Sequence, residues 1–162
     1  MKRCAILVLA TCLIGSACGD DDGTSPTNLP MVFTADLRPA NEVPPIGNAE
    51  GGGFGNAQIT ISGNTATMFF QLTGFPGDTR VVGAHIHRAG PGVNGPILVN
   101  TGVSAASPVL LANRITEFSV SGVPVDAALV QEIANNPLGF YFNVHSPLNP
   151  GGFARGQLVR IQ

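Results

Sequence analysis

Cysteine is missing from most of the chain. Its three cysteines, Cys4, Cys12 and Cys18, all lie within the first 18 residues. The remaining residues therefore have no thiol for a disulfide, a cysteine zinc site, an iron–sulfur cluster or thiol catalysis. A domain built from them must be stabilised by its own hydrophobic core.

Positive charge is also scarce, because Lys2 is the only lysine. From Met31 onward the chain has six arginines and seven acidic residues. Schiff-base chemistry and phosphate binding by a P-loop both need a lysine and are excluded. There is no basic patch for nucleic acid and no polybasic run for anionic lipid, so we expect no nucleic-acid partner.

The one long apolar run lies in the segment MKRCAILVLATCLIGSAC and is too short for a permanent membrane span. Basic residues precede it and small residues follow it, which is typical of a secretory signal peptide. The ending resembles a bacterial lipoprotein cleavage signal, although Gly15 replaces the usual leucine. We expect removal of residues 1–17, lipidation of Cys18 and an acidic flexible tether over residues 18–30. The product would be anchored to the cell envelope, on its periplasmic or extracellular face.

Two alternatives remain for this segment. Cys12, preceded by LAT, is a weaker cleavage site of the same kind. Ordinary secretion, with Cys18 left free or removed, also fits a segment of this layout.

Residues 31–162 consist of short runs in which apolar and polar residues alternate, separated by glycine, proline and asparagine. Such alternation is typical of strands with one buried face. The Gly-Asn pair at 63–64 lies between two of these runs and predicts a β-hairpin. Only residues 125–136, VDAALVQEIANN, have helical spacing. We predict one all-β domain, an antiparallel Greek-key or immunoglobulin-like β-sandwich with one short helix.

Three of the predicted strands each have polar side chains along one face, and together they contain every histidine of the chain. Residues two apart on a strand point the same way. The residues concerned are His85 and His87, then Tyr141, Asn143 and His145, then Arg155 and Gln157. Periodicity does not fix which strands are neighbours, but if these three are, the polar faces merge into one patch.

This patch has two interpretations. His85, His87 and His145 could converge on one copper, zinc or iron ion and leave a position open for water or substrate. Alternatively, the outer face of an antiparallel sheet is ordinarily polar, and histidines there need no metal. From the sequence we favour the second interpretation, a structural or recognition patch.

Glu42 and Arg155 are predicted to form an ion pair. Arg155 lies between Ala154 and Gly156, and these small neighbours allow its guanidinium to lie over the sheet and bind a carboxylate with two hydrogen bonds. Glu42 precedes Pro44-Pro45, which we expect to end the first strand because proline fixes φ and has no N–H.

Three segments together resemble the CHRD domain, a module named after chordin and common in exported bacterial proteins. They are FTADLRPANEVPP, AHIHRAGPGVNGPI and FYFNVHSPLNPGGFARGQL, and the resemblance covers Phe33 to Gln162. It implies an all-β module with an immunoglobulin-like sandwich or barrel but no settled activity; chordin itself is an extracellular growth-factor-binding protein. The matching signature residues are Asn41, Glu42, Pro44, His85, His87, Gly95, Asn143, His145, Arg155 and Gly156.

A fainter likeness is to copper/zinc superoxide dismutase, a Greek-key sandwich in which His-x-His, a later Val-His and a C-terminal arginine occur in the same order. It implies that His85, His87 and His145 are copper ligands and that Arg155 guides an anion. The chain has no fourth histidine to bridge to zinc and no disulfide pair. The likeness therefore implies at most a mononuclear site.

The sequence thus favours an exported, envelope-tethered binding or structural module rather than an enzyme. Its recognition patch would contain Glu42, Tyr141, Asn143, Arg155 and Gln157, and its partners would be the membrane, through the lipid, and an envelope or extracellular protein. No cofactor is required by this interpretation. The alternative is a mononuclear copper or zinc protein, redox-active if the metal is copper, with His85, His87 and His145 as ligands.

Overall fold

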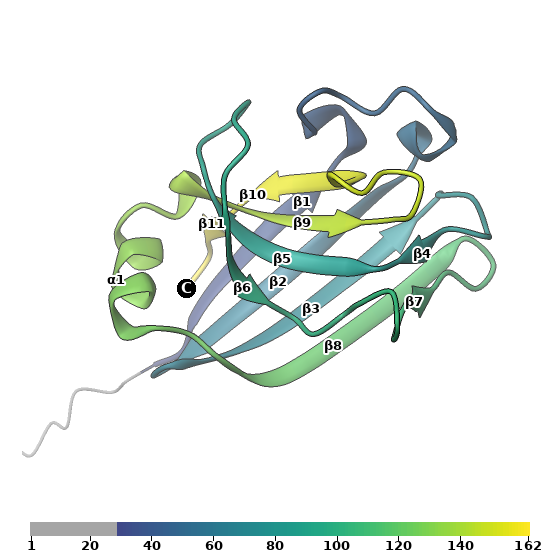
Figure 1. Cartoon of the computed structure of the whole chain (residues 1–162). Coiled ribbons are helices and arrows are strands. Elements are labelled where there is room, and N and C mark those ends of the chain that lie inside the picture. The colour runs from purple at the N-terminus through teal and green to yellow at the C-terminus, as the bar shows by residue number, and fades with distance from the viewer. Residues whose placement is uncertain (1–28) are drawn as a thin grey trace, which may run out of the picture.

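Two antiparallel sheets face each other in the computed structural model, which describes residues 29–162. The first sheet has the strand order β11-β1-β2-β3-β8, the second has the order β10-β9-β5-β6, and β4 pairs with β7. The helix α1 lies at one end of the sandwich and the small β4–β7 sheet near the other (Figure 1). The prediction of an antiparallel all-β sandwich with one short helix is confirmed. The strands are β1 (Met31–Leu37), β2 (Phe54–Ser62), β3 (Thr65–Thr73), β4 (Arg80–Val81), β5 (Gly83–Arg88), β6 (Ile97–Asn100), β7 (Val109–Leu110), β8 (Ile115–Pro124), β9 (Phe140–His145), β10 (Ala154–Gln157) and β11 (Val159–Arg160).

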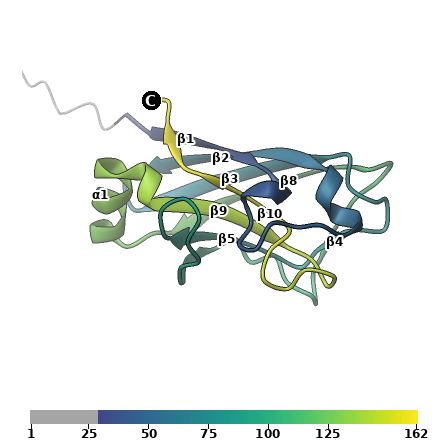
Figure 2. The same ribbon diagram turned by 90° about the horizontal axis from the view of Figure 1, so that it is seen from above.

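The hydrophobic core lies between the two layers, which are seen edge-on in Figure 2. Alternate residues of each strand enter it, because successive side chains on a strand point to opposite faces. The first sheet contributes Phe33, Ala35, Leu37, Ala57, Ile59, Ile61, Ala66, Met68, Phe70 and Leu72; the second contributes Ala84, Ile86, Phe142, Val144 and Ala154. Burial of each large apolar side chain contributes about 1.5–3 kcal/mol. The apolar faces of these strands therefore point inward, and the histidine face of the second sheet points outward.

The helix α1 (Ala127–Asn135) lies within residues 125–136, where the sequence predicts a helix. The carboxylate of Asp126 caps its first turn by accepting hydrogen bonds from the backbone N–H groups of Ala128 and Leu129. Leu129, Val130 and Ile133 are buried against the sandwich. Burial of this apolar face stabilises the helix, which is too short to be stable alone. No helix in the described part of the chain is long and apolar enough to cross a membrane.

The predicted hairpin at residues 63–64 is confirmed, because β2 and β3 pair up to Ser62 and Thr65. The predicted end of the first strand is wrong. β1 ends at Leu37, and a 3-10 helix at Pro39–Asn41 follows, so the chain leaves the strand before Pro44. Pro39 is the residue responsible, because it has no N–H for the sheet and favours the first turn of a helix.

The segment ARGQLVRI divides between the two sheets. Residues Ala154–Gln157 form β10 in the second sheet, whereas Val159–Arg160 form β11 in the first. Leu158, between the two strands, is fully buried. A buried apolar side chain at the crossing point allows the chain to change sheets without exposing its core face.

The three strands that carry the histidine face are neighbours. β9 lies between β5 and β10, with His85 opposite Asn143, His87 opposite Tyr141, Arg155 opposite Asn143, and Gln157 opposite Tyr141. This register gathers the predicted patch on one outer sheet face. The predicted signal peptide, the lipidation at Cys18 and most of the predicted tether lie outside the described residues.

Candidate metal centre

The three histidines converge at one place on the outer face of the second sheet. His85 and His87 come from β5, and His145 ends β9 opposite Gly83. One ring nitrogen of each histidine lies within 4.8 Å of a ring nitrogen of each of the others. The ring centroids are 4.8 Å apart for His85 and His145 and 5.8 Å apart for His87 and His145. Among residues 29–162 this is the one group of three or more histidine, cysteine or acidic side chains arranged to hold a metal ion.

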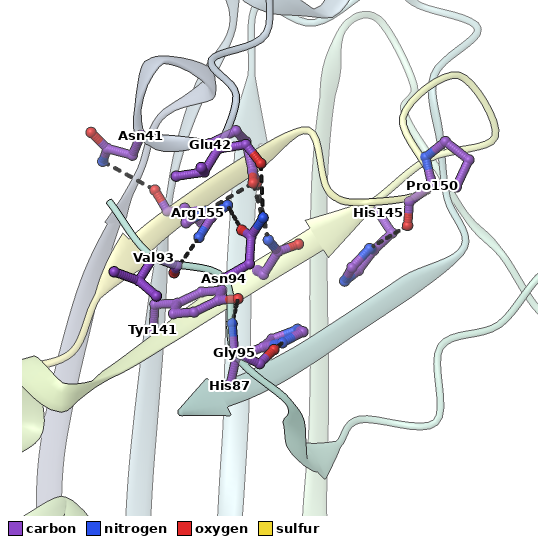
Figure 3. A network of polar contacts seen from close by, with 12 residues as sticks. Asn41, Glu42, His87, Val93, Asn94, Gly95, Tyr141, His145, Pro150 and Arg155 are labelled. Atoms are coloured by element: carbon purple, nitrogen blue, oxygen red, sulfur yellow. Dashed lines mark hydrogen bonds and ion pairs between the residues drawn. The ribbon is translucent and has the colours of Figure 1, made fainter. Parts of the chain in front are cut away.

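Backbone carbonyl groups fix the orientation of two of these rings. The Nδ1 atom of His87 lies 3.0 Å from the oxygen of Gly95, and the Nδ1 atom of His145 lies 2.9 Å from the oxygen of Pro150 (Figure 3). A carbonyl oxygen only accepts hydrogen bonds, so both Nδ1 atoms carry the proton and both Nε2 atoms keep a lone pair. Metal-ligating histidines commonly have this arrangement.

The remaining ring nitrogens have no hydrogen-bond partner. His85 Nδ1, His87 Nε2 and His145 Nε2 are buried atoms without a partner in the protein, and the fourth such side-chain atom among the described residues is Asn143 Oδ1. Burying a polar atom without a partner is costly, and native proteins rarely do so without a ligand or water. All four atoms belong to the same sheet face.

The histidines are poor bases in this setting. Burial, followed by the charges of His145 and His87, lowers the pKa of His85 to about 4. Burial also lowers the pKa of His87 and of His145, against the effect of the backbone hydrogen bond that each makes. At neutral pH the three rings are therefore uncharged, which is the state that binds a metal ion.

Tyr141 supports His87 from the neighbouring strand. The two rings are stacked, with centroids 4.7 Å apart and planes 8° apart. The guanidinium of Arg155 lies 4.6 Å from the centroid of the same tyrosine ring, so Tyr141 is held between Arg155 and His87 (Figure 3). The Tyr141 hydroxyl also accepts a hydrogen bond from the N–H of Gly95. Tyr141 thus connects the histidine to the loop that orients it.

The predicted ion pair between Glu42 and Arg155 is confirmed. Arg155 Nε donates to Glu42 Oε2 over 2.8 Å, and both side chains are only 3% exposed. The contact is single rather than double, because the other two guanidinium nitrogens donate to Val93 O and Asn94 Oδ1. Asn143 Nδ2 also donates to the carboxylate. Burial raises the pKa of Glu42, whereas the charge of Arg155 and the hydrogen bonds from Arg155 and Asn143 act to lower it.

Three loops lie over this face, and the polar side chains connect them to the sheet (Figure 3). Loop 38–53 contributes Glu42, and loop 146–153 contributes the Pro150 carbonyl. Loop 89–96 contributes the Val93 carbonyl, the Asn94 side-chain oxygen and the Gly95 carbonyl. Gly152 has φ of 122°, and a Cβ there would lie 2.5 Å from the Asn143 amide. Glycine is therefore required where the third loop crosses Asn143.

The family model of the CHRD domain matches residues 33–158. The chain belongs to the CHRD-domain family. No curated protein and no solved structure matches the chain. The match includes β5, β9 and β10, so the three histidines and the network around them lie inside the CHRD domain.

The residues predicted as a recognition patch are brought together by the CHRD fold but are not an open surface. Glu42, Tyr141, Asn143 and Arg155 are between 1% and 3% exposed. Gln157 is partly buried and donates hydrogen bonds to three carbonyl groups, those of Ala89, Leu138 and Phe140. The three loops cover them, which residue alternation along single strands does not reveal.

The role that the superoxide dismutase likeness implies for Arg155 does not fit the structure. Arg155 is 2% exposed, and each of its guanidinium nitrogens already donates a hydrogen bond within the domain. It cannot reach an incoming anion. Its role in the CHRD domain is to connect Glu42, Tyr141 and the loop at 89–96.

Sequence reasoning missed Glu50 and Asn94. Glu50 is 3% exposed and accepts hydrogen bonds from Ser146 Oγ and Asn149 Nδ2, which fastens loop 146–153 to loop 38–53. Asn94 Nδ2 donates to the oxygen of Val43, which fastens loop 89–96 to loop 38–53. Both residues lie in glycine-rich or proline-rich stretches without periodicity, so no local pattern identifies them.

The donor set fits a borderline transition metal. Imidazole nitrogen suits zinc and copper, and a site with three histidines is a known arrangement for a metal that keeps a position open. Zinc–nitrogen bonds of about 2.0–2.1 Å place tetrahedral ligands about 3.4 Å apart. The three nitrogens lie within 4.8 Å of one another, so a bound ion would draw them closer together.

Proposed function

We propose that this CHRD domain is an extracytoplasmic binding module that holds a single copper or zinc ion through His85, His87 and His145. The observation that carries this proposal is the convergence of three buried imidazole nitrogens that have no partner in the protein. A ligand that accepts three lone pairs at one point is a metal ion. Such an ion would offset the cost of burying those atoms.

The surrounding residues support the metal interpretation over a metal-free recognition patch, which the sequence alone favours. A histidine with a purely structural role normally has both ring nitrogens engaged, whereas each of these has at least one buried ring nitrogen without a partner. The residues around them are buried and connected to one another rather than open to a partner. They support the site, which is the ordinary role of groups around metal ligands.

Each supporting group has a separate task in this proposal. The carbonyl oxygens of Gly95 and Pro150 hold the protons of His87 and His145 on Nδ1, so that Nε2 faces the ion. Tyr141 keeps the plane of His87 fixed by stacking. A bound ion would supply Lewis acidity, or one-electron chemistry in the case of copper, and three protein ligands leave one position for a further ligand.

Metal analysis of the purified full-length chain tests the proposal. We expect the metal-free protein to bind one copper(II) or zinc(II) ion per chain by isothermal titration calorimetry. His87→Ala and His145→Ala should each weaken the affinity by about a hundredfold or more, since even outer-shell changes cost about 10–100-fold. Gln58→Ala, an exposed change on the first sheet, is the control. Unchanged affinity in the triple histidine variant would contradict the proposal.

Export and envelope tethering are a separate part of the proposal. They are supported by the signal-peptide layout before Cys18 and by a cysteine-free remainder. Expression of the full chain in bacteria supplied with labelled palmitate should give a labelled, membrane-associated protein. Cys18→Ser should lose the label, and Cys12→Ser should keep it. Labelling that is lost in Cys12→Ser and kept in Cys18→Ser would show that the lipidated residue is Cys12 and would contradict lipidation at Cys18.

Recognition of an envelope protein remains a second candidate, because apolar side chains are exposed on the loops beside the histidines. Val93 in loop 89–96 and Leu148 in loop 146–153 are 57% and 56% exposed. Cross-linking in intact cells should capture a defined partner with the wild-type chain and lose it with Val93→Asp/Leu148→Asp. Equal capture by the wild-type chain and the variant would exclude these loops as the surface that binds the partner.

A further inference from the structure

A pocket opens from solvent directly onto the histidine pair. Its volume is about 290 Å³, and His85 and His145 form part of its wall. The other lining residues are Val82, Gly83, Ile97, Ser146, Pro147 and Pro150. His87, by contrast, is 6% exposed and packed against Tyr141, so the site is closed on that side. A metal ion held by the three histidines would be accessible from solvent through this pocket.

Gly83 keeps the two rings accessible. It lies two residues before His85 on the same face of β5 and is opposite His145 in β9. A Cβ at Gly83 would lie 3.0 Å from His85 Cε1 and 3.3 Å from His145 Cδ2. The backbone of Gly83 does not have the positive φ that requires glycine. The feature that glycine provides here is the space between the two imidazole rings.

The pocket offers a ligand few polar partners. No residue of its lining is acidic, lysine or arginine. The hydroxyl of Ser146 is already used, because it donates to Glu50 Oε2 over 2.6 Å. Pro147 and Pro150 have no backbone N–H to donate. A sugar, nucleotide or peptide would leave its hydrogen-bonding groups unpaired in such a pocket, which costs affinity.

We infer that this pocket binds a small monodentate ligand of the metal, a compact molecule that needs no hydrogen bonds from the protein, and that Gly83 keeps its path to the metal open. The inference rests on the proposed metal site and names the class of ligand that the site takes. Molecules with the dimensions of azide or a diatomic gas belong to this class. Larger polar metabolites do not.

Azide binding to the full-length chain loaded with one copper(II) ion tests the inference. We expect a charge-transfer absorption band that saturates with azide. Gly83→Ala should weaken azide binding by about tenfold or more, because the added methyl group occupies the space through which azide reaches the metal. The copper stoichiometry and the nitrogen hyperfine pattern in electron paramagnetic resonance should stay unchanged. Gly90→Ala, whose added Cβ meets nothing within 4 Å, is the matched control.

A second variant keeps the test decisive if Gly83→Ala disturbs copper binding or folding. Ile97 lines the pocket and is 50% exposed, so Ile97→Trp narrows the mouth without replacing a histidine. Because Ile97 is opposite His87 in the β5–β6 pair, the copper stoichiometry is measured in this variant as well. Ile97→Trp should reduce azide affinity in the same way. Azide affinity equal to wild type in Ile97→Trp, or in a copper-loaded Gly83→Ala, would overturn the inference. If the wild-type chain binds copper but not azide, the pocket inference fails and the proposed metal site stands. If the chain binds no metal, the proposed function fails as well.

Discussion

At the scale of single residues, the main feature is a buried ionic network beside neutral histidines. Glu42 and Arg155 are both removed from water, and Asn143, Asn94 and the Val93 carbonyl supply the hydrogen bonds that water would have made. Desolvation of two charges is costly, so such a pair contributes little net stability. The network instead holds β10, loop 38–53 and loop 89–96 in fixed positions relative to one another.

Removing one member of that pair should therefore be strongly destabilising. Glu42→Gln leaves the Arg155 charge buried without a counter-charge, and we expect the free energy of unfolding to fall by about 3–5 kcal/mol. Urea denaturation followed by circular dichroism measures it. The control is Asp36→Asn, which breaks the exposed pair between Asp36 and Arg38 and should cost less than about 1 kcal/mol. Equal effects of the two changes would mean that the buried pair is unimportant.

The partnerless histidines lead to the opposite expectation. In the metal-free protein, His85→Leu removes a buried nitrogen that has no partner, so the free energy of unfolding should stay the same or rise. Zinc at a hundred times its dissociation constant should stabilise the wild type by about 2.7 kcal/mol and leave His85→Leu unchanged. Ile86→Ala, on the core face of the same strand, should lose about 2–5 kcal/mol. A loss of similar size in His85→Leu would indicate a structural histidine.

At the scale of elements, the strands supply the ligands and the loops orient them. β5 and β9 contribute the three imidazoles, while loops 89–96 and 146–153 contribute the carbonyl groups that hold two of the rings. Loop 89–96 is itself restricted by a close approach at Gly95, whose added Cβ would collide with the carbonyl oxygen of Arg88. Changes in a loop should therefore alter the site without removing a ligand.

Gly95→Ala tests that division of roles. The new methyl group forces loop 89–96 to move, so the Gly95 oxygen should lose its hydrogen bond to His87. We expect zinc affinity to fall by about 10–100-fold, the size of an outer-shell effect. Calorimetry provides the affinity, and Gly90→Ala in the same loop is the control because its Cβ would meet open space. Wild-type affinity in Gly95→Ala would show that the carbonyl does not orient His87.

At the scale of the whole molecule, the sandwich separates two kinds of burial. Its interior is apolar and stabilises the fold, whereas the outer face of the second sheet is polar and is buried by loops. The second kind makes the stability of the metal-free protein depend on pH, because groups with shifted pKa values are concentrated there.

We expect the metal-free protein to lose stability as the pH falls below about 6.5. The three histidines have lowered pKa values in the folded state, to about 4 for His85. Between these values and 6.5 the unfolded chain binds more protons, so acid favours unfolding, by at most about 1.4 kcal/mol per pH unit per histidine. Glu42 acts in the opposite sense, because its raised pKa makes the folded state the better proton binder above 4.5.

Thermal unfolding between pH 4 and pH 8 measures this dependence. The slope below pH 6.5 should be smaller in His85→Leu than in the wild type, since one of the three groups is gone. Saturating zinc should shift the decline to lower pH, because the ion competes with protons for the same nitrogens. A metal-free wild type with equal stability at pH 5 and pH 7 would contradict the expectation.

The sequence by itself determined what depends on local order along the chain. The period of two indicated strands with one buried face, the Gly-Asn pair identified the hairpin of β2 and β3, and parity placed His85 with His87 and Asn143 with His145. These features follow from strand geometry alone, because alternate side chains point to opposite faces.

Only the tertiary structure decided which strands are neighbours and what covers them. Glu42 and Arg155 are 113 residues apart, and the loops that bury them have no periodicity from which their path could be predicted. Strand order and loop packing are set by the free energy of the whole sandwich, in which long-range contacts must offset the entropy of closing each loop. For this reason residue alternation predicted an exposed polar patch, and the folded CHRD domain instead has a largely loop-covered face with three buried imidazole nitrogens that have no hydrogen-bond partner.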